Sequence, residues 1–420
     1  MSPMTSNNTA ETRIRSLGTN IPEAPKPISR HGSQMELENS AGGDDRLKIA
    51  VARLEYLTPV GTGRVLDKSK TGVPSFSPEA LKEAGLTPET WSLEVVADMA
   101  SGSVIESPLT RVTNNALDWN GLMGLAEKHA IRFLHPCICT NVDDPFHVDL
   151  WEGVPLREIV WLAKPKAAIR RVYYQSYQPG NLQPFQASLP LGDVLETPPG
   201  HVPAVLAYKM NGLMIPAAQG GPVRVVVPGT FGNKSIKWLR RLVLTNDYRA
   251  NDTDASDFNS DTDTAFKTKA RFVSVPPEVA AGESVPLTGF VLVGISGISK
   301  VQYCVHNQEQ PWPADDPYWT NADWQDATIL PAPADWGGGL PGGKLPADIT
   351  QVDAPIGAAL KWPMRFTIAH WAVLMPGLPA GNYDVCCRTI DKNGIAQPMP
   401  RPLPRTGANA IHKVKLTVRR

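Results

Sequence analysis

The chain has 420 residues, of which 42% are hydrophobic and 20% are charged. Its 41 basic residues balance its 41 acidic ones, a composition that gives no support for binding of nucleic acid or another polyanion. The length allows two or three domains, and the 40 prolines and 34 glycines indicate many loops and strands rather than long helices.

The N-terminal 45 residues are polar and lack hydrophobic periodicity, which predicts a disordered tail. They contain no apolar core and no twin arginine, so no export signal is visible and we expect a cytoplasmic protein. No apolar stretch is long enough to span a membrane. The five cysteines show no disulfide framework, and adjacent Cys386 and Cys387 would point to opposite faces of a strand.

Ordered structure is predicted from residue 46 onward. A short helix should follow Ser77, with Pro78 in its first position and Gly85 near its end. An amphipathic helix should begin near Pro155. Strand patterns occupy four further segments: 90–98, 129–137, 202–212 and 220–229. The valine run in the last of these segments indicates burial on both faces.

The composition changes after this first part of the chain. Residues 246–264 are polar and acidic, and we interpret them as a solvated loop. After it, short strand patterns alternate with Gly, Pro and Asn turns, and no good helix pattern appears. We therefore expect a mixed α/β domain over residues 46–268 and an all-β sandwich domain over residues 269–420.

Two cysteines, Cys137 and Cys139, lie one residue apart in "LHPCICT". Four roles compete: packing of buried thiols, a zinc site with His135 and His147, a Cys–His nucleophile, or a single thiolate on a redox metal held by an organic cofactor. The zinc spacing matches no common pattern. For a nucleophile, His135 or His147 would be the base, but no third group that orients the base can be identified.

The segment 220–245, "GGPVRVVVPGTFGNKSIKWLRRLVLT", resembles the molybdenum-cofactor domain of the sulfite oxidase family. Upstream, "KHAIRFLHPC" is similar to the strand that ends in the family's molybdenum-ligating cysteine. Downstream, "GISKVQYCVHN" and "NYDVCCRTIDKNGIAQP" resemble the family's immunoglobulin-like dimerisation domain. The resemblance covers roughly residues 90 to 420.

The resemblance implies a molybdopterin cofactor whose metal is bound by Cys137, with Cys139 as the alternative ligand. Thiolate sulfur is a suitable donor for such a metal. Cationic and hydroxyl groups suit the cofactor's phosphate, and glycine permits close approach of the backbone. The cofactor-binding residues are then Arg224, Gly232, Lys234, Ser235, Lys237 and Asn141. Without the resemblance, a strand–turn–strand with an exposed basic face explains the same segment.

The residues that would face the substrate depart from the family pattern. Asn141 comes one residue later than the family spacing, and Val142 stands where sulfite-oxidising relatives place arginine. Phe185 occupies the position of a catalytic tyrosine, and Gln219 replaces a histidine. Arg64 and Lys68 stand near the place of an early histidine motif. The departures make the cofactor a firmer expectation than sulfite as the substrate.

The fold class expected is α+β: a molybdopterin-binding domain followed by an immunoglobulin-like sandwich. We expect an oxidoreductase that transfers an oxygen atom or two electrons on a small substrate, with sulfur compounds included. No haem or nucleotide motif is visible, so electrons should pass to an external acceptor such as a cytochrome. The family resemblance further implies a homodimer, and it leaves a periplasmic location open. The rival interpretation is a degenerate, non-catalytic cofactor-binding or structural protein.

Overall fold

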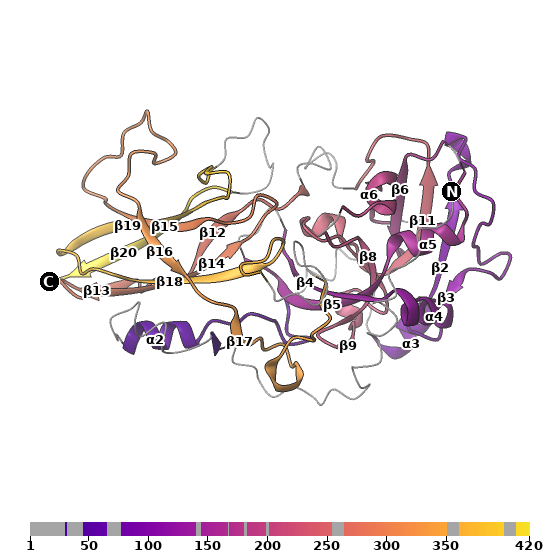
Figure 1. The fold of residues 1–420 in the computed structure, drawn as a ribbon, viewed down its shortest axis with the longest axis horizontal. Helices are drawn as coiled ribbons and strands as arrows, with labels where there is room; N and C mark the ends of the chain where they lie inside the picture. Colours follow the sequence, from indigo (N-terminus) through magenta and orange to yellow (C-terminus); the bar gives the residue numbers. More distant parts are fainter. Residues whose placement is uncertain are drawn as a thin grey trace.

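The computed structural model describes these residues: 30–31, 45–64, 77–139, 144–166, 168–179, 183–198, 201–253, 264–350, 361–398 and 409–420. They form a mixed α/β part, which carries helices α3 to α6, and a part built from strands β12 to β20, side by side in Figure 1. The predicted α+β class is confirmed. Of the predicted tail, only β1 (Arg30–His31) and Asp45 are among the described residues.

The first sheet of the α/β part contains five strands in the order β3-β2-β11-β6-β7. Only β11 and β2 pair in parallel; the other neighbours are antiparallel. The Nε1 atom of buried Trp91 donates to the Leu239 carbonyl (2.9 Å), which ties the start of β2 to β11. The bounds are β2 (Ser92–Ala97), β3 (Leu117–Asp118), β6 (Arg171–Ser176), β7 (Gln186–Pro190) and β11 (Leu239–Thr245).

The second sheet positions the cysteine pair. It is antiparallel, in the order β10-β8-β5-β4, with β9 on β8. All nine residues of β5 are buried. Strand burial on both faces removes the alternation by which a strand is identified, so β5 was missed in the sequence. The bounds are β4 (Ile131–Cys137), β5 (His147–Pro155), β8 (Val205–Met210), β9 (Leu213–Met214) and β10 (Arg224–Val226).

Four helices surround these sheets: α3 (Pro78–Glu83), α4 (Trp119–His129), α5 (Leu156–Leu162) and α6 (Leu191–Leu195). The helix predicted after Ser77 is confirmed, and the Ser77 hydroxyl caps it by accepting from Ala80 N (3.3 Å). The predicted helix near Pro155 is also confirmed, beginning at Leu156. Helix α4 was missed; Asp118 caps it by accepting from Gly121 N (2.8 Å).

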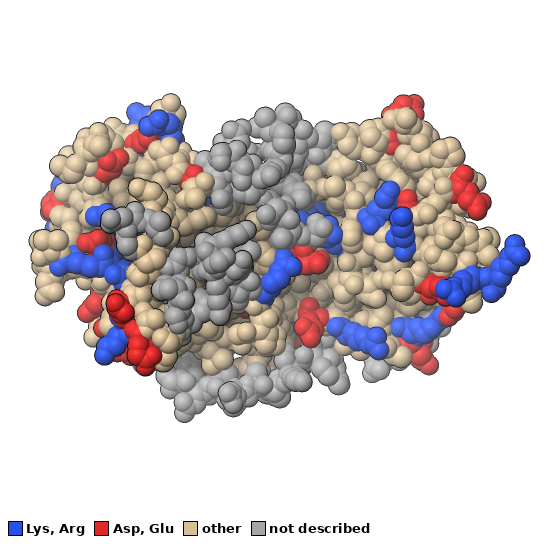
Figure 2. Space-filling model, turned by 180° about the vertical axis from the view of Figure 1, so that it is seen from behind, with Lys and Arg blue, Asp and Glu red and all other residues tan. Residues whose placement is uncertain are grey.

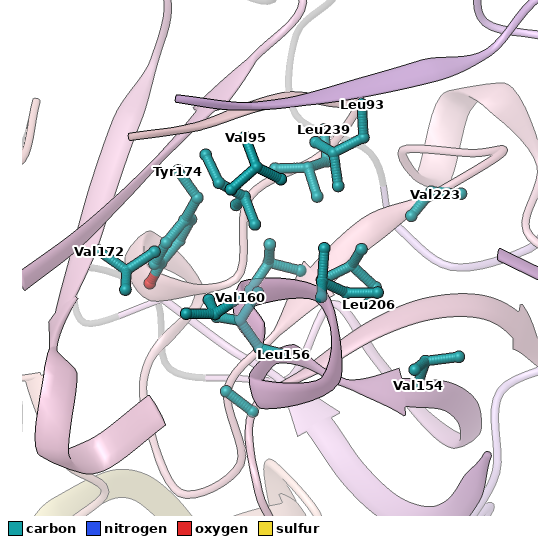
Figure 3. Packing of buried hydrophobic residues seen from close by; sticks show 14 of the residues in the cluster. Leu93, Val95, Val154, Leu156, Val160, Val172, Tyr174, Leu206, Val223 and Leu239 are labelled. Carbon is teal, nitrogen blue, oxygen red and sulfur yellow. The ribbon is translucent and has the colours of Figure 1, made fainter. Parts of the chain in front are cut away.

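The core of the α/β part lies between the two sheets. Figure 3 shows Leu93, Val172 and Leu239 of the first sheet directed towards Leu206 and Val154 of the second. Helix α5 contributes Leu156 and Val160 to the same cluster, and all seven side chains are fully buried or nearly so. Because burying each such side chain contributes about 1.5–3 kcal/mol, this core fixes the relative position of the sheets and so of their loops.

The second part of the chain is a β-sandwich of eight strands, in the order β12-β14-β18-β16-β15-β19-β20-β13. Strands from the two ends of this order are in contact. The N–H of Phe272 in β12 donates to Nδ1 of His412 in β20 (3.0 Å). The predicted all-β domain is confirmed, while its immunoglobulin-like character stays a prediction. The bounds are β12 (Lys269–Ser274), β13 (Glu278–Ala280), β14 (Val285–Leu292), β15 (Lys300–Asn307), β16 (Gln325–Ile329), β18 (Ile368–Met375), β19 (Gly381–Ile390) and β20 (His412–Arg419).

Helix α2 (Asp45–Ala52) packs on the β-sandwich and not on the domain to which the predicted boundaries assigned it. Its Leu47 and Val51 join a cluster with Leu330 and Ala372. Close by, β1 pairs with β17 (Pro333–Asp335). An isolated amphipathic helix cannot show which sheet will cover its apolar face, so this attachment was not readable from the sequence.

An apolar cluster joins the two parts. It combines Leu134 and Ile138, which flank Cys137, with Phe231 and with the sandwich residues Phe290 and Phe366. The candidate cysteine therefore lies close to the junction of the two parts, on backbone that is fixed from both sides.

Charges of both signs are mixed over the face shown in Figure 2, in agreement with the balanced composition. Within the described residues, no helix is both long and apolar enough to cross a membrane. Of the predicted solvated loop at 246–264, residues 246–253 and 264 are described, and Tyr248 and Arg249 among them are exposed. Its described part is attached to the first sheet: Tyr173 Oη donates to the Arg249 carbonyl (2.9 Å), and Ser188 Oγ donates to Asp252 Oδ1 (2.7 Å).

Candidate cofactor site

Cys137 ends β4 and lies beside a tight turn that follows β10. This turn, η5 (Gly232–Lys234), is held to the cysteine loop by a hydrogen bond from Gly232 N to the Ile138 carbonyl (2.7 Å). A Cβ atom on Gly232 would lie 3.7 Å from Sγ of Cys137. Two residues that the sequence predicted for one site, 95 positions apart, are therefore adjacent in the structure.

His147 lies directly across from Cys137 in the register of β4 and β5. Its ring hydrogen-bonds the Cys137 thiol, and its Nδ1 atom hydrogen-bonds Oδ2 of Asp149, two residues further along the same strand. The other carboxylate oxygen, Oδ1, accepts from Asn211 Nδ2 (3.3 Å). The orienting group that the sequence did not reveal for His147 is therefore Asp149.

The charge environment favours the thiolate form of Cys137. Burial raises the pKa of its thiol, but the positive charge and hydrogen bond of His147, with smaller effects from Arg224 and Lys237, lower the pKa to about 7. Burial lowers the pKa of His147, but Asp149 and Cys137 together raise it to about 9. Both shifts favour a thiolate beside an imidazolium, and the thiolate is the form that binds metals.

Arg224 and Lys237 place two more cations in this site. Arg224 is 1% exposed, and its guanidinium lies 5.2 Å from the Trp151 ring centroid. Its Nη1 and Nη2 atoms donate to the carbonyls of Gln219 (2.7 Å) and Ser235 (2.9 Å). Lys237 Nζ donates to the Ala218 carbonyl (2.8 Å). Neither cation pairs with a carboxylate in the described part of the chain.

Arg224 and Lys237 lack a compensating carboxylate among the described residues. Burial and the charge of Arg224 lower the pKa of Lys237 to about 8. Arg224 Nε and Gln219 Oε1 are buried polar atoms that have no hydrogen-bond partner among the described residues. Buried charges and polar atoms are costly unless an opposite charge or a hydrogen bond satisfies them. The site therefore fits an anionic group that forms hydrogen bonds and lies next to a sulfur donor. A molybdopterin cofactor is such a group.

Lys234 and Ser235 were predicted to bind the same cofactor, but the structure engages both within the protein. Lys234 is 1% exposed; its Nζ atom donates to the Ser188 carbonyl (2.8 Å) and forms an ion pair with Asp252. Ser235 Oγ accepts from Val227 N (3.0 Å). These contacts support the turn that carries Gly232. Asn141, the sixth predicted cofactor residue, lies outside the described residues.

The positions predicted to face the substrate are only partly described. Phe185 precedes β7 and packs against the core of the α/β part, and its N–H donates to Ser176 Oγ (3.1 Å). Gln219 Nε2 donates to the Gly63 carbonyl (3.1 Å), and a Cβ on Gly63 would be 2.9 Å from Cβ of His147. The next residue, Arg64, lies over the Phe146 ring (4.5 Å). Val142 and Lys68 are outside the described residues.

The remaining cysteines are less engaged. Cys139 is partly buried, two residues beyond Cys137, and Cys304, Cys386 and Cys387 are buried free thiols of the β-sandwich. No group of three or more His, Cys, Asp or Glu side chains is placed to hold a metal in the parts of the chain that the structure covers. The zinc set weighed from sequence, with both cysteines, His135 and His147, is therefore not assembled.

Gly232 offers a direct test of the space beside the sulfur. Gly232→Ala adds a methyl group at ordinary contact distances, 3.4 Å from the Ile138 carbonyl and 3.7 Å from Sγ of Cys137, and should leave cofactor content close to normal. Gly232→Leu should fill the space beside the sulfur and lower the molybdenum and pterin contents by about 10-fold or more, since a ligand cannot share volume with a side chain. Equal contents in both variants would contradict this placement.

Comparison with known proteins identifies the domain that contains the site. Residues 85–252 match the family model described as "Oxidoreductase molybdopterin binding domain". The nitrate reductase [NADPH] of Fusarium oxysporum is 34% identical over 98 residues, which cover 23% of this chain and 10% of that protein. The sulfite oxidase of Gallus gallus is 37% identical over 102 residues, which cover 23% of this chain and 21% of that protein. The aligned segment therefore spans only a small part of these relatives.

The fold extends the similarity beyond that segment. The chain resembles the sulfane dehydrogenase SoxCD from Paracoccus pantotrophus with a TM-score of 0.55, over 79% of this chain and 77% of that one, at 16% identity. The matched family domain contains Cys137, Gly232, Arg224 and Lys237. Residues 85–252 are therefore a molybdopterin-binding oxidoreductase domain, similar to segments of sulfite oxidases and nitrate reductases.

Proposed function

We propose that this chain oxidises or reduces a small substrate at a molybdenum ion that Cys137 ligates, with electrons passing to an external acceptor. The observation that carries the proposal is the thiol of Cys137 beside buried cations that have no carboxylate partner among the described residues. The cofactor supplies two-electron oxygen-atom transfer when it is bound. The protein supplies the site in which this chemistry takes place.

Each residue has a distinct task in this proposal. Cys137 provides the soft sulfur donor and Cys139 does not, because the His147 hydrogen bond and the nearby cations act on Cys137. Arg224 and Lys237 compensate the negative charge of the cofactor, and the buried Trp151 ring keeps water from the guanidinium of Arg224. Charge-assisted hydrogen bonds of this kind are stronger than neutral ones. Gly232 leaves space beside the sulfur.

This geometry argues against the rival interpretation of a degenerate protein. In a protein that binds no cofactor, the buried Arg224 with its unsatisfied Nε atom would only destabilise the fold. Such a group costs about 1–3 kcal/mol or more. The uncompensated cations have a clear benefit only if an anionic ligand occupies the site.

Sulfite is expected to be a poor substrate. Phe185 and Val142 stand where sulfite-oxidising relatives place a tyrosine and an arginine, and the loss of one charge-assisted pair weakens anion binding by about 1.5–3 kcal/mol. The measurement is sulfite-dependent reduction of cytochrome c or ferricyanide by molybdenum-replete protein. A kcat/KM above ~10⁴ M⁻¹s⁻¹, within the ordinary range for enzymes on their own substrates, would contradict this expectation.

A double variant tests the same idea in the opposite direction. Phe185→Tyr combined with Val142→Arg should raise sulfite turnover by restoring a hydroxyl and a cation near the developing charge. The matched control is Phe185→Tyr alone, which adds the hydroxyl without the cation. If the double variant gains nothing over the native chain, the substrate does not bind where the family resemblance implies.

We further propose a symmetric homodimer formed through residues 270–420. The basis is the resemblance of this region to a dimerisation domain, together with the β-sandwich that it forms. Light scattering at micromolar concentration should give a mass near twice the 45.6 kDa of one chain. A mass of one chain at that concentration would remove this proposal.

A further inference from the structure

His147 is held in one orientation by groups that contact both sides of its ring. Its Nδ1 atom is bound to Asp149, which leaves Nε2 for the hydrogen bond with Cys137. On strand β5, the side chains of His147 and Asp149 share one face because they are two residues apart. The Trp151 ring, on the same face, lies 5.8 Å from the imidazole between centroids.

The carboxylate of Asp149 is itself fixed. Asp149 and Asn211 are fully buried. Asn211 Nδ2 donates to Asp149 Oδ1 (3.3 Å) and to the Thr58 carbonyl (2.7 Å), while Asn211 Oδ1 accepts from Leu150 N (2.8 Å). Asn211 adopts a left-handed backbone conformation (φ 48°), which asparagine tolerates better than most residues. Hydrogen bonds therefore hold each side chain between the Thr58 carbonyl and the Cys137 sulfur, namely those of Asn211, Asp149 and His147.

We propose that His147 is the positioning residue for the metal ligand: it donates a hydrogen bond from Nε2 to Sγ of Cys137, and Asp149 and Asn211 fix its tautomer and orientation. The inference rests on the proposed function, in which Cys137 ligates molybdenum. A partner of this kind does not bind the metal. It orients the ligand and, by drawing electron density from the sulfur, shifts the reduction potential upward.

Hydrogen bonds to ligand sulfur are a recognised means of tuning a metal centre, and the carboxylate–histidine pair supplies an unusually well-supported donor here. The relevant sequence signal is the spacing of His147 and Asp149 on β5. It becomes readable only when β5 is known to pair with β4 in the register that opposes His147 to Cys137.

The test uses three variants of the full chain, each isolated with its cofactor. His147→Leu removes the donor, and Asp149→Asn keeps the size of the side chain while disturbing the tautomer. His135→Leu is the matched control: His135 is equally buried on β4, but it stacks on Phe266 (5.2 Å) and no hydrogen bond joins it to Cys137 among the described contacts. Thermal unfolding of each variant shows whether it folds. If His147→Leu does not fold, the result for Asp149→Asn tests the inference.

Two measurements that do not depend on turnover report the role. The rate at which molybdenum is released during dialysis should rise about 10- to 100-fold in His147→Leu, in proportion to the loss of metal affinity that usually follows removal of an outer-shell partner. The molybdenum midpoint potential, followed by electron paramagnetic resonance during a redox titration, should fall in His147→Leu and in Asp149→Asn. Both quantities should be unchanged in His135→Leu.

A potential and a release rate that stay at native values in folded His147→Leu or Asp149→Asn protein would overturn the inference. Equal shifts in His135→Leu would overturn it as well, because they would indicate a general loss of packing. Retention of molybdenum with an unchanged number of sulfur ligands by Cys137→Ser would instead show that the proposed function is wrong in its choice of ligand. That outcome is distinct, since it concerns the sulfur and not its partner.

Discussion

Cys137→Ser should remove molybdenum from the protein and abolish turnover while leaving pterin bound. A hydroxyl is a harder and weaker donor than a thiolate for this metal. The loss should exceed the roughly 100-fold that follows from disturbing an outer-shell partner, because the ligand itself is removed. The pterin should stay because Arg224 and Lys237 are unaffected. Metal analysis and pterin fluorescence on the same sample measure the two quantities separately.

Cys139→Ser is the matched control for this experiment. Cys139 is partly buried in the same loop, so both variants make the same chemical change within three residues. The Cys139 variant should keep its molybdenum and most of its activity. A metal-free Cys139→Ser protein beside an active Cys137→Ser protein would transfer the ligand role to Cys139, the alternative that the sequence left open.

Lys234→Met should destabilise the fold more than it weakens cofactor binding. Lys234 and Asp252 form a buried ion pair, with side-chain exposures of 1% and 7%. Removing the lysine leaves Asp252 buried without this cation, which costs about 3–5 kcal/mol in comparable pairs. Urea unfolding of the cofactor-free protein should therefore show a clearly lower midpoint, with a similar dependence on denaturant.

Lys237→Met provides the comparison for this prediction. Lys237 has no carboxylate partner among the described residues, and its ammonium donates to one carbonyl. This variant should lose little stability and much of its affinity for the cofactor. If instead Lys234→Met unfolds like the native chain and loses its pterin, Lys234 binds the cofactor as the sequence predicted. A further change, Asp252→Leu in the Lys234→Met background, should restore part of the lost stability.

Local signals in the sequence accounted for much of the fold. The helix after Ser77 was predictable because a serine cap and a first-turn proline act within four residues. Strand β4 was predictable from its apolar run. Strand β5 was not, because burial on both faces gave it no alternation and the helix that follows it begins at once. The docking of α2 depended on tertiary contacts that leave no trace in a local pattern.

The part of the site that lies within one short segment of the sequence was predictable. Arg224, Gly232 and Lys237 lie close together in sequence, and the structure brings them to Cys137. The sequence could not separate Lys237 from Lys234, since both follow the same turn and only the fold shows that Lys234 meets Asp252. His147 and Asp149 act on Cys137 through strand register, which a linear reading does not reveal.

The ligation of molybdenum by Cys137 is tested most directly by the sulfur coordination of the metal, measured by X-ray absorption at the molybdenum edge on native and Cys137→Ser protein. The dithiolene of the cofactor supplies sulfur in both samples, and a protein thiolate adds one more sulfur in the native sample only. The account predicts a native protein with about one molybdenum per chain and a sulfur count that falls by one in any metal retained by the variant. An unchanged sulfur count in a metal-replete Cys137→Ser protein would contradict it.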